Sequence, residues 1–115
     1  MTLGNAQSAF LRHLVEETDL PFQIDNNSAW EAVRLFKEEV DNAMFPPCLF
    51  DALPDPFLIA SAMAEDGLGS GWLIVLVEHP REKGYIGWIF YQHEQTSSPA
   101  FWIFPDGSIK DISFN

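Results

Sequence analysis

Apolar and polar positions alternate with a helical period near the start of the chain, over residues 5–18. Four apolar residues of this segment fall on one side of a helix, and charged residues take the other side. Pro21 follows, and proline cannot continue the interior of a helix. The pattern therefore predicts a first helix over residues 5–18, with its apolar side formed by Phe10, Leu11, Leu14 and Val15.

A second helical period runs over residues 28–42. Ser28 and Glu31 match a capping box, in which each side chain satisfies a free backbone N–H of the other residue. Apolar residues then recur at intervals of three, three and four, and charged residues lie opposite them. The pattern predicts a second helix ending near Asn42, with an apolar stripe formed by Trp30, Val33, Phe36 and Val40.

The middle of the chain has weaker periodicity. Residues 43–56 hold four of the eight prolines but are otherwise apolar, which predicts a packed irregular connection. Residues 56–66 are apolar or small at nearly every position, so their period decides nothing. They fit a short buried helix that ends at Gly67, or a strand paired through the turn Gly67–Gly71. We favour the helix.

The last 45 residues show the short apolar runs and regular turns of a β-meander. Proline and glycine separate these runs at residues 80–84 and 105–107. The predicted fold class is α+β, a single acidic domain of residues 1–115 in which N-terminal helices pack on a C-terminal antiparallel β-meander of three to four strands. The strands are predicted at Trp72–His79, Tyr85–His93, Ala100–Phe104 and Ser108–Phe114.

Two of these strands, Trp72–Val77 and Tyr85–Tyr91, are apolar on both faces. Such strands normally lie centrally and are covered on both sides. Either the helices straddle the sheet, or its second face is a partner surface. The second alternative makes the sheet aromatics candidate partner-binding residues, since tryptophan is enriched in interface hot spots. Otherwise the same rings fill the core. The candidates are Trp72, Trp88, Phe90 and Trp102. Lys110 and Asp111 place the fourth strand at an edge of the sheet.

The charge of the chain narrows the class of partner. Seventeen acids against six bases give a net charge of −11, and residues 1–66 carry −9 of it. Such a field repels nucleic acid and anionic membranes and attracts basic proteins. Its simplest alternative meaning is solubility. The candidate acidic partner-binding face lies on the second predicted helix and consists of Glu31, Glu38, Glu39 and Asp41.

Candidate chemistry is sparse. His79 and His93 end neighbouring predicted strands, but no ligand spacing typical of a metal site accompanies them. Cys48 lies between Pro47 and Leu49, where we expect a buried, unreactive thiol. The loop Gly67–Gly71 lacks the lysine and the following helix of a phosphate-binding loop. We therefore expect no catalytic residue, no metal, no cofactor and no enzymatic activity.

The sequence also bears on location. The longest apolar run, Trp72–Val77, is far shorter than the roughly 20 residues of a membrane-spanning helix. The first ten residues lack the basic start and apolar core of a signal peptide. A single cysteine permits no intrachain disulfide, which fits a reducing compartment. We expect a cytoplasmic protein that binds neither membrane nor nucleic acid.

Small size, acidic charge and an aromatic sheet suit a protein-binding module. The leading hypothesis is an inhibitor of a basic partner protein, of the bacterial immunity or antitoxin type, which the charge would attract and steer. The alternative is a self-associating, homodimeric domain that buries its apolar sheet face and holds a small apolar ligand between sheet and helices.

Overall fold

An antiparallel sheet forms the centre of the computed structural model, which describes residues 2–17, 30–65, 71–92 and 94–112. Six strands follow one another across the sheet in the order β1-β2-β3-β4-β6-β7, and the short β5 also pairs with β4. The connectivity is therefore a meander throughout. The strands are β1 (Glu31–Leu35), β2 (Phe57–Glu65), β3 (Gly71–Glu78), β4 (Tyr85–Tyr91), β5 (Thr96–Ser97), β6 (Ala100–Ile103) and β7 (Ile109–Ile112).

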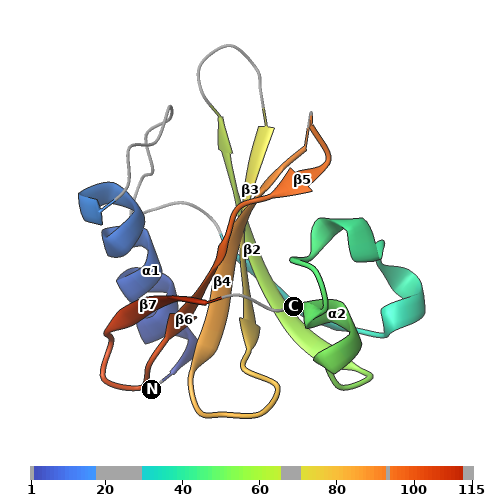
Figure 1. The fold of residues 1–115 in the computed structure, drawn as a ribbon, viewed down its shortest axis with the longest axis horizontal. Helices are drawn as coiled ribbons and strands as arrows, with labels where there is room; N and C mark the ends of the chain where they lie inside the picture. Colours follow the sequence, from blue (N-terminus) through green and yellow to red (C-terminus); the bar gives the residue numbers. More distant parts are fainter. Residues whose placement is uncertain (1, 18–29, 66–70, 93, 113–115) are drawn as a thin grey trace.

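Helix α1 (Leu3–Glu17) covers one face of this sheet (Figure 1). Its buried residues repeat with the predicted helical spacing and pack on the strand residues that point to the same side, among them Ile74 and Ile89. The Phe10 ring lies 5.8 Å from the ring of Phe101 on β6. The predicted first helix is thus confirmed, but Val15, predicted on its apolar side, is 61% exposed because it points away from the sheet. Its buried residues are Ala6, Phe10, Leu11 and Leu14.

The chain between β1 and β2 covers the opposite face (Figure 1). It contains two 3-10 turns, η1 (Lys37–Glu39) and η2 (Asn42–Met44), and the short helix α2 (Leu49–Ala52). Its prolines prevent long regular structure, and its apolar residues still pack into a core, as the sequence predicts. Its side chains in this core are Phe45, Leu49 and Leu53, which pack with Val75, Val77, Ile86 and Trp88 from the sheet.

Both faces of the central strands are therefore covered by the same chain. In β3 the residues from Ile74 to Val77 are all buried, and they alternate between the two cores. This confirms that strands apolar on both faces lie centrally. The α+β class holds, with β7 at the predicted edge. The predicted strand number is too low, because β1, β2 and the short β5 join the four expected strands.

The predicted second helix is wrong. Glu31–Leu35 is the strand β1, which pairs antiparallel with β2, and only the 3-10 turn η1 and part of η2 follow within the predicted range. The apolar stripe that suggested a helix is not a core stripe, since Val33 and Phe36 stay about half exposed. Pairing with β2 therefore overrides the local helical pattern. Ser28 of the expected capping box lies outside the described residues.

The preference for a helix at residues 56–66 is also wrong. Phe57–Glu65 forms β2 and pairs with β1 on one side and β3 on the other. Nearly every position is apolar because β2 is an interior strand. Phe57 and Ile59 face the α2 side, whereas the small Ala60 faces α1. Residues 66–70 of the predicted glycine-rich turn lie outside the described part.

A bulge interrupts the ladder beside β4. The register of β4 with β5 differs by one residue from its register with β6, so Ser98 and Pro99 together oppose Ile89. Ser98 repairs the ladder here. Its backbone N–H donates to the Ile89 carbonyl at 2.7 Å, and its hydroxyl accepts from the Ile89 N–H at 2.9 Å. Both polar groups of the buried Ile89 backbone are thereby satisfied, and Ser98 supplies the donor to its carbonyl that Pro99 lacks.

Candidate functional site

The exposed charge of the described structure concentrates on residues 31–55, which we call the acidic segment. It comprises β1, η1, η2, α2 and their connections, and contains six acids against two bases, a net charge of −4. Every one of the six acids is exposed. They include the four residues of the predicted acidic face and two more: Glu31, Glu38, Glu39, Asp41, Asp51 and Asp55.

Three of these carboxylates also hold the segment in shape. Glu39 accepts a hydrogen bond from the Phe36 N–H at 2.8 Å, and Asp41 accepts from the Ala43 N–H at 2.9 Å. Asp55 accepts from the Lys37 N–H at 2.9 Å, which joins the end of the segment to η1. The acids that the predicted helix put on one helical face are therefore displayed by an irregular segment.

The remaining acids are directed to solvent. Within the described residues, the carboxylates of Glu31, Glu38 and Asp51 make no hydrogen bond, and no Lys or Arg lies within ion-pair distance of any carboxylate. The Lys37 ammonium instead lies 3.5 Å from the Asp51 carbonyl oxygen and 5.4 Å from the centre of the Phe50 ring. The negative charge of the segment is thus not neutralised locally, and it acts on approaching molecules over about one Debye length.

Exposed apolar side chains adjoin these acids. Val33 on β1, Phe36 just after it and Met63 on the neighbouring β2 are 47%, 51% and 50% exposed. Exposed apolar side chains near charged groups also occur on protein-binding surfaces. The sequence suggested no such role for these residues, because the helical reading buried Val33 and Phe36. The alternation of Val33 and Leu35 with Ala32 and Arg34 was the signal for a strand.

The four aromatic residues proposed as a sheet-face site do not form one surface. Trp88 is fully buried, Phe90 is 7% exposed, and both belong to the core under the acidic segment. Trp102 is half-buried on that same face of the sheet. Trp72 packs on the α1 side, against Tyr91 at 4.6 Å between ring centres. Trp88 and Phe90 therefore fill the core, which is the alternative that the sequence left open for these rings.

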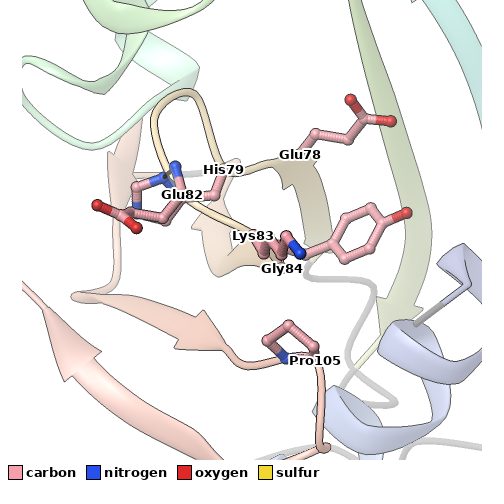
Figure 2. Close-up of a pocket in the computed structure, with 7 residues that line it drawn as sticks. Glu78, His79, Glu82, Lys83, Gly84 and Pro105 are labelled. Atoms are coloured by element: carbon pink, nitrogen blue, oxygen red, sulfur yellow. Dashed lines mark hydrogen bonds between the residues drawn. The ribbon is translucent and has the colours of Figure 1, made fainter.

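A pocket of about 320 Å³ lies at the β3–β4 hairpin (Figure 2). Figure 2 shows Glu78 on one side of the hairpin and His79 with Glu82 on the other. Burial raises the pKa of Tyr85, and the nearby Glu78 charge raises it further. The pocket is lined by Glu78, His79, Glu82, Lys83, Gly84, Tyr85 and Pro105.

His79 organises the hairpin tip. Its Nδ1 accepts hydrogen bonds from the N–H groups of Arg81 at 3.1 Å and Glu82 at 3.0 Å, so the neutral ring carries its hydrogen on Nε2. Its ring centre lies 4.8 Å from that of Trp102, whose indole N–H donates to the Lys83 carbonyl at 3.0 Å. Nothing in the local sequence around His79 indicates this role.

We expect the hairpin tip to loosen as the pH falls. Burial lowers the pKa of His79. The nearby Glu82 carboxylate raises this pKa in part, and the Arg81 charge lowers it again. The unfolded chain therefore binds more protons below its His pKa of about 6.5, and the stabilisation is lost as pH falls through the lower folded pKa. NMR titration should show a His79 midpoint below this value, with the Arg81 and Glu82 amides following it. A midpoint above about 6.5 would contradict a neutral His79 ring that accepts hydrogen bonds at Nδ1.

Other candidate chemistry is not assembled. In the ranges that the structure describes, no group of three His, Cys, Asp or Glu side chains could hold a metal ion, and His93 lies outside them. Cys48 is exposed, with a left-handed backbone at φ 67°, so the expectation of a buried thiol is wrong. The chain turns at Cys48 to start α2, and this turn leaves the side chain outside the core.

No described helix is long and apolar enough to cross a membrane.

Comparison of the chain with protein-family models, curated proteins and solved structures gives no match.

Proposed function

We propose that the protein binds a basic partner protein through the acidic segment, as an inhibitor of the immunity or antitoxin type. The observation that carries this proposal is the exposure of all six carboxylates of the segment beside the exposed Val33 and Phe36. Complementary charge accelerates association and orients the partner, and the apolar side chains supply contact area. The cytoplasm is part of the proposal, since an exposed thiol persists in a reducing compartment.

Self-association through an apolar sheet face has less support. The sequence suggested it because the central strands are apolar on both faces. α1 covers one of these faces and the acidic segment covers the other. Neither face therefore requires a second copy of the chain to cover it. We therefore rank the basic partner first and propose neither a cofactor nor an enzymatic reaction.

Reversal of two acids should weaken partner binding by about tenfold. The variant Glu31→Lys with Glu38→Lys replaces two attractive contacts by repulsive ones, and exposed pairs each contribute up to about 1 kcal/mol. The matched control is Asp111→Lys with Glu94→Lys, which changes the net charge equally at exposed positions outside the segment. Affinity is measured for the main protein retained from source-cell lysate at low salt.

Three outcomes decide this proposal. A basic retained protein that is lost in about 0.5 M salt and on reversal of Glu31 and Glu38, but not in the control, supports it. If both double variants weaken binding equally, only the net charge of the protein matters, and the assignment of binding to the acidic segment is overturned. An acidic main partner, or binding indifferent to salt, overturns the electrostatic basis altogether.

A further inference from the structure

We propose that the partner docks by adding a strand to the free edge of β1, and that the added strand is an extended segment with basic residues around an apolar centre. This inference rests on the proposed function, since it takes the partner to be a basic protein. It goes further in naming the docking element and the backbone geometry of the contact.

The edge of β1 offers unpaired backbone groups. β1 is the first strand in the order of the sheet, and in the described part of the chain it pairs on one side only, from Glu31 opposite Ser61 to Leu35 opposite Phe57. The outward N–H and C=O groups of such a strand are a template for another strand. At the other end of the sheet, β7 carries Lys110 and Asp111 at its centre, a charged pair that discourages pairing.

The exposure of the β1 side chains also favours the addition of a strand at this edge. Its first four residues are exposed, so the strand contributes little to either core. Val33 at its centre and Phe36 just beyond it keep about half of their surface in water. An added strand would cover these apolar groups, which the described residues of this chain leave uncovered. Apolar surface removed from water in this way favours docking by about 25 cal/mol per Å².

The register identifies the chemistry of the occupant. Val33 pairs with Ile59, whose side chain lies in the core under the acidic segment, so Glu31, Val33 and Leu35 point to that face of the sheet. Directly opposite residues in an antiparallel pair interact most strongly. An added strand should therefore place an apolar residue by Val33 and a cation by Glu31. The exposed Glu38, beyond the end of β1, favours a second cation there.

A second copy of this chain is a poorer occupant. Pairing of β1 with its own copy would bring together two acidic segments, each of net charge −4. Like charges at an interface oppose association and favour a partner of opposite charge. We therefore assign the edge to a basic partner, and homodimer formation becomes an outcome that the test must distinguish.

The test uses a short synthetic peptide with lysine at both ends and alternating threonine and valine between them. Its control has the same side chains with N-methylated valines, which cannot donate the backbone hydrogen bonds of a strand. Both are titrated into the ¹⁵N-labelled full chain, and amide hydrogen exchange is followed along β1 and β7. We expect the first peptide to slow exchange of β1 amides about tenfold or more, the control peptide not to, and β7 to stay unchanged.

The variants sharpen the result. Glu31→Lys should reduce the protection of β1, whereas Asp111→Lys on the opposite edge strand should not, although both reverse an exposed acid. Equal binding of both peptides overturns strand addition and leaves the basic partner standing. Protection of β7 in place of β1 overturns the choice of edge. Protection of β1 that grows with protein concentration without peptide assigns the edge to a second copy and overturns the proposal.

Discussion

Trp88→Ala is expected to lower the free energy of unfolding by about 3–5 kcal/mol, the range for loss of a large buried ring. Trp88 is fully buried at the centre of the core between the sheet and the acidic segment. Its ring centre lies 5.4 Å from that of Phe45, and its indole N–H donates to the Met44 carbonyl at 2.9 Å. The variant leaves both a cavity and an unsatisfied carbonyl. Urea denaturation followed by circular dichroism measures the change.

Trp102→Ala is the matched control. Trp102 also donates its indole N–H to a backbone carbonyl, that of Lys83, but it is half-buried near the hairpin tip. Because less surface is removed from water there, we expect a loss of about 1–2 kcal/mol. Equal losses in the two variants would contradict the different positions of the two rings. Trp88→Phe keeps most of the packing and isolates the hydrogen bond to Met44, worth about 1–3 kcal/mol.

This core also supports the proposed binding surface. The acidic segment has little regular structure of its own, and its inner side chains, Phe45, Leu49 and Leu53, fix it to the sheet. The outer carboxylates are positioned by that packing and by three hydrogen bonds that carboxylates accept from backbone N–H groups. Loss of Trp88 should therefore weaken partner binding as well as stability, although Trp88 itself is not at the surface.

The C-terminal half of the fold is predictable because its signals are local. Proline and glycine mark the β3–β4 and β6–β7 turns, and the strands in this part of the chain are rich in aromatic and β-branched residues. The apolar character of both strand faces in β3 also carries the correct inference that two layers cover the sheet. A short interruption such as Ser98–Pro99 leaves that reading intact, since it shifts the register by only one residue.

The N-terminal half is less predictable because pairing across the sheet decides it. The helical spacing from Trp30 to Val40 is real, but it comes from a strand followed by 3-10 turns. In β2 apolar or small residues stand on both faces and contribute to both cores, which erases the period of two that identifies a strand. No local signal reveals that the two segments pair, since 21 residues separate Leu35 from its partner Phe57.

The candidate site is predictable in composition but not in geometry. The acidic face was chosen by charge, and all four of its residues are exposed. The aromatic face was chosen by residue type, which does not say which side of a sheet a ring occupies, and Trp72 lies on the side opposite to Trp88. The free edge of β1 could not be foreseen once Glu31–Leu35 was taken for a helix.

The second large effect is expected at Gly87, the neighbour of Trp88 on β4, which faces α1. A Cβ added there would lie 2.7 Å from the Phe10 ring and 2.9 Å from a Leu76 methyl group, closer than side-chain contacts allow. The missing side chain of Gly87 therefore provides the space in which Phe10 fixes α1 to the sheet. We expect Gly87→Val to destabilise the fold by about 1–3 kcal/mol or more, as overpacking does.

A double-mutant cycle tests whether Gly87 acts through Phe10. Phe10→Ala alone should cost about 3–5 kcal/mol, since the ring is fully buried. If the clash with Phe10 is the cause, Gly87→Val should cost much less in the Phe10→Ala background, because the valine enters the vacated space. The coupling should then reach about 1–3 kcal/mol in urea denaturation. Additive losses would contradict this reading and assign the cost of Gly87→Val to the contact with Leu76 or to the β4 backbone.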